Sequence, residues 1–366
     1  MLEWIIYALL IFYVHINYLL FFVSSFFSKK IKPKKIKNYP KISVIIPTKN
    51  EANVIDETLK RVRKCDYPKN KLEIIIVDAN SKDETIKIAK KYADKIIIEK
   101  KPNGKPHALN IGIKKASGDI IYFLDADNWI EKDTIKTLIQ SMNGYNAAKG
   151  TTIIRNKKSV IEKVSNLEIG IHELLVSGFS KIFNSEIISG YNFMIKKNIL
   201  RCVGYFHNSL TEDINISFRL YKRGERISII NAPCSILVPK NLHSYWKQQE
   251  RWRMGGINEL IKMLKIKNSM MDLFIKMPFL VLSTIVCSIS IILFLFYLIF
   301  GGFILLSGAI IGFILIITSV IRFDKKELIY LPAIYLFYTI LEIASFFNIF
   351  IKKLKNKKIV WQKTPK

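Results

Sequence analysis

The feature that most constrains the fold is an alternation of short apolar runs and helical stretches between about residues 40 and 265. Runs rich in β-branched residues predict four strands: ISVII (42–46), EIIIV (73–77), KIII (95–98) and DIIYFL (119–124). Lysine-rich helical stretches follow them at 51–64, 83–93, 108–116 and 131–142. This order predicts an α/β domain whose mainly parallel sheet is covered by helices on both faces. Ligands of such sheets bind at the carboxyl ends of the strands.

The two ends of the chain are strongly apolar. Residues 4–27 carry no formal charge, and an apolar helix of that length crosses a hydrocarbon layer of about 30 Å. We interpret them as a retained transmembrane anchor, because they follow Glu3 and contain no small-residue cleavage site. A second apolar block at 278–350 is interrupted at Gly301 and at the charged run 322–327. It predicts about three further segments of spanning length.

The charge distribution predicts which side of the membrane the central part occupies. The chain of 366 residues has 57 Lys and Arg against 29 Asp and Glu, a formal net charge of +28, yet it is 50% hydrophobic. That apolar content excludes a disordered basic tail. Because the lysine run at 29–37 follows the first span, the residues after it are expected in the cytoplasm. Four crossings would leave the basic tail, 351–366, outside, whereas its lysines favour the inside, so its side stays open.

The cysteines carry no metal or disulfide signal. They are spread singly along the chain, at Cys65, Cys202, Cys234 and Cys287. A zinc site or a disulfide framework requires closer or paired spacings. We therefore expect packing residues in a reducing cytosol.

Charged residues follow the predicted strands. Asp78 ends the second strand, Lys105 precedes a helix, and Asp125 and Asp127 follow the strand DIIYFL. Two such carboxylates at the ligand edge repel each other unless a cation joins them. Their hard oxygens suit Mg²⁺ or Mn²⁺, which are usually shared with substrate phosphates. Lys105 can add a positive charge beside the same diphosphate. Together these residues predict a nucleotide-diphosphate site.

The order of the motifs extends that prediction. Along residues 42–256 the chain reads VIIPTKNEANVI, IIIVDANSKDET, GKPHALNIG, FLDADNWI, ISGYNFMIKKNILRCVGYF, TEDINISFRL and QQERW. DxD alone is a weak signal, but the ordered series ending in TED and QxxRW is specific. The chain resembles the family-2 glycosyltransferases, which are inverting GT-A enzymes. Within that family it is similar to the membrane-bound branch of cellulose and hyaluronan synthases and ceramide glucosyltransferase.

The resemblance implies a role for each matching residue. The residues expected to bind the nucleotide-sugar are Pro47, Glu51, Asp78, Lys105, Asp125, Gln248 and Arg251. Asp127, with Asp125, would hold Mg²⁺ or Mn²⁺. Asp213 of TED would be the general base, with Glu212 and Trp252 on the acceptor side. The chain departs from the usual pattern at Ala79 and Asn80, which bears on the identity of the base that is bound, and in VGYF around Gly204.

The expected organisation follows from the resemblance and the apolar blocks. We expect an anchor at 4–27, a GT-A domain at 40–241, the QxxRW and interfacial helices at 242–277, transmembrane segments at 278–350 and a basic tail at 351–366. The protein would then be a multi-pass cell-membrane protein with a cytoplasmic catalytic domain.

Three functions are compatible with these features. The first is transfer of a sugar, with inversion, from a nucleotide-sugar to a lipid-linked or glycan acceptor at the cytoplasmic face; UDP is the expected nucleotide and GDP the alternative. The second is a processive polysaccharide synthase of the cellulose or hyaluronan type, for which four spans give little pore material unless protomers associate. The third is a non-catalytic polybasic membrane protein. Because the lysines are dispersed, nucleic acid is the least expected partner.

Overall fold

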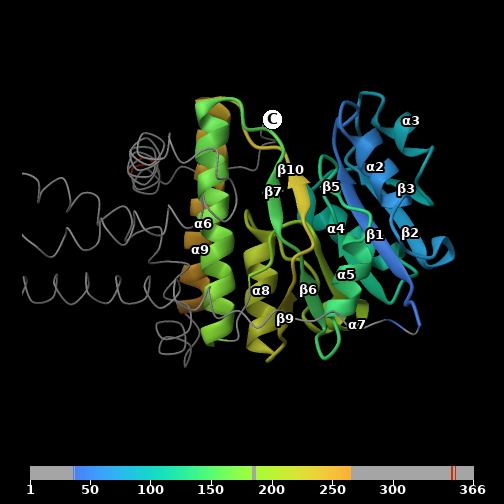
Figure 1. Ribbon diagram of the computed structural model, residues 1–366. Helices are drawn as coiled ribbons and strands as arrows, with labels where there is room; N and C mark the ends of the chain where they lie inside the picture. The colour runs from blue at the N-terminus through green and yellow to red at the C-terminus, as the bar shows by residue number, and fades with distance from the viewer. Residues whose placement is uncertain (1–35, 37, 184–186, 265–347, 349–350, 352–366) are drawn as a thin grey trace, which may run out of the picture. The chain divides into compact units, whose positions relative to one another are not determined.

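The computed structural model describes residue 36, residues 38–183 and 187–264, and residues 348 and 351 (Figure 1). The chain forms two compact units. We call Lys29–Arg155 with Ser185–Leu237 the sheet unit, and Met1–Ser28, Asn156–Asn184 and Val238–Lys366 the helical unit. The domain expected at 40–241 is therefore interrupted by residues 156–184, which group with the later part of the chain.

A seven-stranded sheet forms the centre of the sheet unit, in the order β3-β2-β1-β4-β8-β6-β9. The strands are β1 Ile42–Thr48, β2 Leu72–Asp78, β3 Lys95–Ile98, β4 Ile120–Phe123, β6 Ala147–Lys149, β8 Phe193–Lys196 and β9 Ile227–Ile229. Only β8 runs antiparallel to its neighbours. The first four are the strands expected from the apolar runs, so the mainly parallel α/β sheet is confirmed. Every residue of β2 is buried, as is typical of a central parallel strand.

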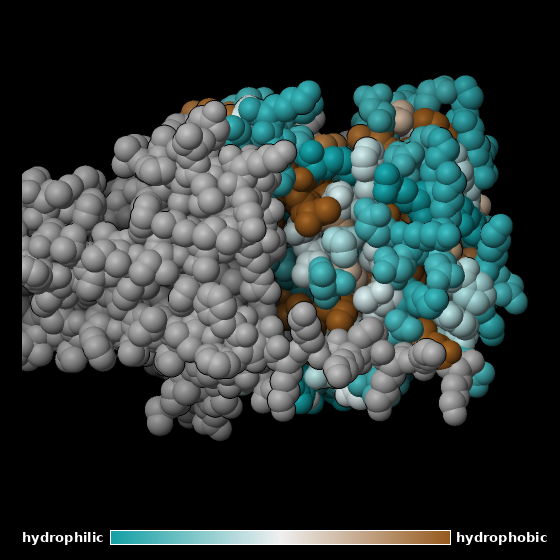
Figure 2. Space-filling model, in the orientation of Figure 1, coloured by the Kyte–Doolittle hydropathy of each residue, from teal (hydrophilic) through white to brown (hydrophobic). Residues whose placement is uncertain are grey.

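Helices pack against this sheet. They are α2 Ile55–Arg63, α3 Thr85–Ala89, α4 Gly104–Lys115, α5 Thr134–Ser141, α7 Lys197–Cys202 and α8 Glu212–Lys222, with a 3₁₀ turn at Lys69–Lys71. The first four confirm the helices expected between the strands. Helix α4 lies unusually close to β1, because a Cβ at Gly112 would stand 2.6 Å from Ile45 Cγ2. Figure 2 shows that the surface over α2 and α3 is mostly hydrophilic.

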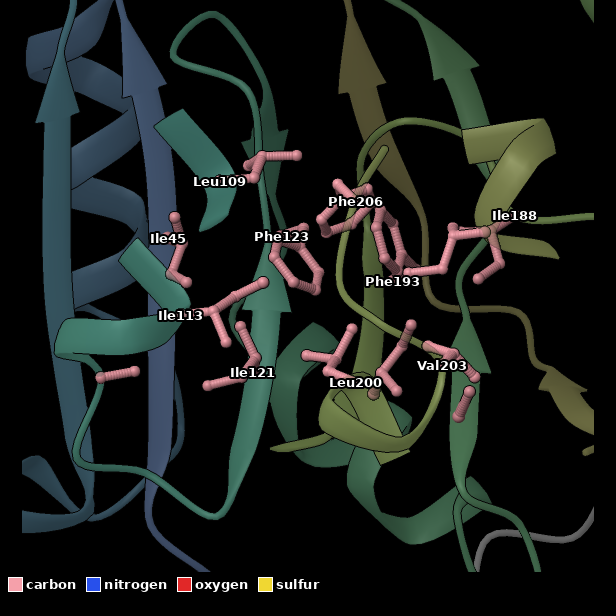
Figure 3. Close-up of a cluster of buried hydrophobic side chains, with 14 of the residues drawn as sticks. Ile45, Leu109, Ile113, Ile121, Phe123, Ile188, Phe193, Leu200, Val203 and Phe206 are labelled. Atoms are coloured by element: carbon pink, nitrogen blue, oxygen red, sulfur yellow. The ribbon is translucent and has the colours of Figure 1, made fainter. Parts of the chain in front are cut away.

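The core lies where α4 and the loop before α8 meet the middle of the sheet (Figure 3). Phe123 of β4 stacks on Phe193 of β8 with ring centroids 4.7 Å apart. Phe206 meets Phe123 edge to face at 5.2 Å. Each aromatic pair adds about 0.5–1.5 kcal/mol beyond its area burial. This cluster fixes β8 against β4. It therefore also fixes the loops that precede and follow these two strands.

A second, three-stranded sheet was not expected from the sequence. Its strands are β5 Trp129–Ile130, β10 Cys234–Ile236 and β7 Thr152–Ile154, in that order. Asn192 ties it to the main sheet: its amide nitrogen donates to Ala232 O at 2.9 Å and to Thr151 O at 3.1 Å, beside the second sheet. The buried Asn192 has φ 54, a left-handed conformation that asparagine tolerates. Strands of two or three residues are too short for periodicity to reveal.

The helical unit contributes two long helices that lie side by side, α6 Val160–Phe183 and α9 Leu242–Leu264 (Figure 1). A capping box begins α6: Glu162 N donates to Ser159 Oγ at 3.2 Å, and Ser159 N donates to Glu162 Oε2 at 2.7 Å. No helix was predicted from the sequence for the residues of α6. Within the described chain, no helix is long and apolar enough to cross a bilayer. The spans predicted at 4–27 and 278–350 lie outside it, apart from residue 348.

Candidate active site

Three neighbouring strands carry some of the predicted nucleotide-binding residues to one edge of the sheet. Thr48 and Asp78 are register partners at the carboxyl ends of β1 and β2, and β4 pairs in parallel on the other side of β1. Pro47 lies beyond the last β1–β4 pair, Ile45 with Phe123, so its missing N–H removes no bond from that ladder. Glu51 follows in the next loop, where its N–H donates to Thr85 Oγ1 at 2.7 Å.

Asp78 is fully buried, and its carboxylate is already hydrogen-bonded within the chain. It accepts from Thr48 Oγ1 at 3.0 Å, from Ser81 N at 2.8 Å and from Ser81 Oγ at 2.5 Å. These bonds hold the loop after β2 against the end of β1. The geometry therefore gives Asp78 a role in shaping the loop. Contact with a base edge stays a prediction for this residue.

Lys105 stands among three oxygen acceptors. Its Nζ lies 2.7 Å from Asp125 Oδ1, 2.9 Å from Gly190 O and 3.4 Å from Glu212 Oε1. The residue enters the site from the first turn of α4, where Gly104 takes a φ of 81 that favours glycine. Burial alone would lower the pKa of Lys105, but the negative charges of Asp125 and Glu212 outweigh it and raise that pKa. The ammonium is therefore a fixed positive charge.

The TED residues join Lys105 at the start of α8. Glu212 is buried and Asp213 is half-buried in the first turn of the helix, where the helix dipole favours negative charge. Gly190 marks the point at which they converge. A Cβ there would lie 3.2 Å from Lys105 Nζ, 3.4 Å from Glu212 Oε1 and 3.5 Å from Asp213 Oδ2. Four sequence motifs, GKPHALNIG, FLDADNWI, ISGYN and TED, thus contribute to one cluster.

Asp125 and Asp127 fit a divalent cation that is shared with a substrate. Their carboxylates are hard oxygen donors on one loop, Asp125 partly exposed and Asp127 8% exposed. Among the described residues no group of three or more His, Cys, Asp or Glu could hold a metal alone. Mg²⁺ and Mn²⁺ sites of this kind take their remaining ligands from phosphates and water. Asp125 and Asp127 are the residues that would hold the ion.

The QxxRW residues belong to the helical unit. Gln248 is buried, whereas Arg251 and Trp252 are half-buried. Arg251 Nε is buried and makes no hydrogen bond with a described residue. The adjacent residue, Gln249, donates its amide to Glu168 of α6, at 2.9 Å to Oε1 and 2.7 Å to Oε2.

Three residues whose tertiary contacts matter here were not predicted from the sequence. Gly190 lies inside the quoted motif ISGYN, which could have pointed to it. Arg155 and Glu168 carried no motif signal, and only tertiary contacts reveal them. Cys65 and Cys234 are buried and form no disulfide, as expected for packing residues, whereas Cys202 is exposed.

The strand order, the acidic edge and the Lys105 cluster agree with the GT-A domain that the motif series predicts. The model of the Glycosyl transferase family 2 matches residues 43–204. That segment, less than half of the chain, is therefore similar to a family-2 glycosyltransferase domain.

Curated relatives agree with this domain. The chain is 32% identical over 262 residues to a probable glycosyltransferase, YdaM, of Bacillus subtilis, covering 66% of this chain and 62% of the relative. It is 34% identical over 231 residues to a poly-beta-1,6-N-acetyl-D-glucosamine synthase of Staphylococcus aureus, covering 60% of this chain and 56% of the relative. The chain thus spans little more than half the length of these relatives.

A solved structure supports the fold. The mannosyltransferase PcManGT from Pyrobaculum calidifontis, in complex with GDP-Man and Mn²⁺, superposes with a TM-score of 0.67 at 21% identity, covering 96% of this chain and 99% of the other.

Proposed function

We propose that the protein transfers a sugar, with inversion, from a nucleotide-sugar to a lipid-linked or glycan acceptor. The observation that carries the proposal is the cluster in which Lys105 Nζ lies within 3.4 Å of Asp125 and Glu212, with Asp213 beside Gly190. It places one positive charge among the acids of two motifs that lie far apart in the sequence.

The donor side needs positive charge where the leaving diphosphate forms. Lys105 is half-buried and charged, so it stabilises that negative charge without much rearrangement. A divalent ion held by Asp125 and Asp127 supplies further Lewis-acid stabilisation of the phosphates when bound. The mannosyltransferase with this fold binds GDP-Man and Mn²⁺, which supports a nucleotide-sugar and a divalent cation here. We assign Pro47 and Glu51 to the nucleoside part of the donor.

The acceptor side needs a base. Single displacement requires that the acceptor hydroxyl lose its proton as it attacks the anomeric carbon from the face opposite the leaving group. We assign that role to Asp213, whose Oδ1 is bonded locally to Ile214 N at 2.9 Å. Glu212 differs from it, because its carboxylate pairs with Lys105. Glu212 therefore orients the lysine and borders the acceptor. Gln248, Arg251 and Trp252 complete the proposed machinery by family resemblance.

A membrane location belongs to the same proposal. The apolar segments 4–27 and 278–350 and the lysine run 29–37 support a multi-pass cell-membrane protein whose catalytic domain faces the cytoplasm. A lipid-linked acceptor, or a product that leaves through the bilayer, would fit that location.

A processive polysaccharide synthase is the second candidate. The 34% identity to a poly-beta-1,6-N-acetyl-D-glucosamine synthase favours it. Such an enzyme needs a path through the bilayer for its polymer. The four predicted spans give little material for such a path unless protomers associate.

One experiment tests the activity and separates the two candidates. The full chain in membranes is incubated with radiolabelled UDP-sugars and GDP-sugars and Mn²⁺, and the products are sized. Label in organic-phase lipid or short glycans supports single transfer, whereas a long polymer supports the synthase. Absence of transfer from every donor would overturn both candidate functions. The Asp213→Asn variant serves as the inactive control in each incubation.

A further inference from the structure

Arg155 makes contacts that no motif accounts for. It follows β7, and its Nη2 donates to the backbone oxygen of Asp127 at 2.9 Å. Its Nη1 donates to Ser235 O in β10 at 3.2 Å. Its Cζ lies 3.6 Å from the ring centroid of Trp129 in β5. One guanidinium thus joins the second sheet to the loop that carries both DxD carboxylates.

The frame around Arg155 is rigid. Its own backbone N–H donates to Ile236 O at 2.9 Å, and Trp129 is the register partner of Ser235. Burial lowers the pKa of Arg155, and the charge of Asp127 opposes that shift. An arginine side chain remains charged in proteins. The guanidinium plane is therefore held on one side by the indole and at its edges by two carbonyls.

The DxD loop also makes contacts of its own. Within it, Asn128 N donates to Asp125 O at 3.2 Å, a long bond. The Asn128 side chain is 1% exposed, yet its Nδ2 makes no hydrogen bond with a described residue. Asp125 is held through Lys105. The Arg155 guanidinium holds the backbone oxygen of the residue between these two, Asp127.

We propose that Arg155 is a positioning residue that sets the direction of the Asp127 carboxylate toward the divalent cation. The inference rests on the proposed function, because it assumes that Asp127 is a metal ligand. Groups that orient metal ligands typically change metal affinity by about 10–100-fold when they are replaced. Lysine would not substitute, since it lacks the planar fork that reaches two carbonyls while lying flat on an indole.

The test measures Mn²⁺ binding to the full chain in the presence of UDP and of GDP, by electron paramagnetic resonance of the free ion. Arg155→Lys keeps the charge and removes the planar fork, and Arg155→Gln removes the charge. Arg61→Lys is the matched control, because Arg61 also lies over Trp129, at 4.7 Å, but pairs with Glu57 at 2.8 Å. We expect Mn²⁺ affinity to fall about tenfold or more in both Arg155 variants, and to be unchanged in Arg61→Lys.

A second readout separates positioning from stability. At saturating donor, the Mn²⁺ concentration that gives half-maximal transfer should rise in Arg155→Lys by the same factor as the Mn²⁺ dissociation constant. The melting temperature of this variant should stay near that of the parent. Tighter Mn²⁺ binding in Arg155→Gln would show a purely electrostatic role and overturn the inference. Parent-like affinity in Arg155→Lys, an equal loss in Arg61→Lys, or unfolding of both Arg155 variants would overturn it too. If the parent chain itself binds no Mn²⁺ with either nucleotide, the proposed function fails first.

Discussion

Lys105 Nζ lies 2.7 Å from Asp125 Oδ1, so the first DxD carboxylate is paired with an ammonium from another motif. The same nitrogen reaches Gly190 O at 2.9 Å and Glu212 Oε1 at 3.4 Å. These three contacts make Lys105 the counter-ion of the acidic edge. A divalent cation that binds Asp125 must share this carboxylate with Lys105 or displace it.

Replacing Lys105 by methionine should therefore have two opposite effects. The leaving diphosphate loses a fixed positive charge, and kcat/KM should fall by about 10²–10³-fold. Mn²⁺ binding without nucleotide should become tighter, because Asp125 is released. Steady-state kinetics and electron paramagnetic resonance measure the two effects. Lys101→Met, at an exposed site in the loop before α4, is the control and should behave like the parent. Unchanged kinetics in the Lys105 variant would contradict its assignment.

Asp213→Asn should abolish transfer while donor binding persists. The amide keeps the size of the side chain but cannot accept the proton from the acceptor hydroxyl, and loss of a general base costs about 10²–10⁴-fold in rate. Single-turnover transfer and equilibrium binding of the nucleotide would be measured on the same preparation. Transfer at the parental rate would exclude Asp213 as the base.

Gly190→Ala should impair activity more than stability. The new Cβ would stand 3.2 Å from Lys105 Nζ and 3.4 Å from Glu212 Oε1, so both charged ends must shift by a few tenths of an ångström. Displacement of catalytic groups by about 1 Å can cost about 10²-fold, so we expect a smaller loss, about tenfold in kcat. Thermal melting is the control. A large drop in melting temperature with parental kcat would contradict this view of the site.

Glu73 should make stability depend on pH. Its burial in β2 would raise its pKa, but bonds from Lys95 Nζ at 2.7 Å, Ser43 Oγ at 2.5 Å and Ser117 N at 2.9 Å outweigh burial and hold the pKa at about 2. The pKa of Glu73 in the folded chain is below its ordinary value of 4.5. The ionised Glu73 therefore contributes its full stabilisation of the fold above pH 4.5, and this contribution is lost as the pH falls towards 2.

The variant Glu73→Gln should accordingly lower the free energy of unfolding at pH 7 by about 2 kcal/mol, allowing for the half-exposed Lys95. The difference from the parent should shrink between pH 4.5 and pH 3. Chemical denaturation of the full chain at several pH values checks it. Glu84→Gln removes an exposed pair with Lys87 and should change the free energy of unfolding little. A difference between Glu73→Gln and the parent that stays constant across this pH range would contradict the assignment.

Much of the sheet could be predicted from the sequence because its signals are local. The apolar runs at 42–46, 73–77, 95–98 and 119–124 became β1 to β4, and the helices between them formed as expected. The second sheet escaped prediction because β5 has two residues and its partners come from distant segments. Helix α6 was also missed, and with it the buried contact between Glu168 and Gln249.

The sequence by itself determined the α/β order of the domain and the residue types of its ligand edge, since strand periodicity and short motifs are properties of neighbouring residues. Only the tertiary structure decided which of them meet. Lys105 and Asp125 are 20 positions apart and Lys105 and Glu212 are 107 apart, yet parallel strands and the Phe123–Phe193 core bring their segments together. Arg155 reaches Asp127 for the same reason: the bond depends on how β7 and β10 pair, and no local pattern encodes that pairing.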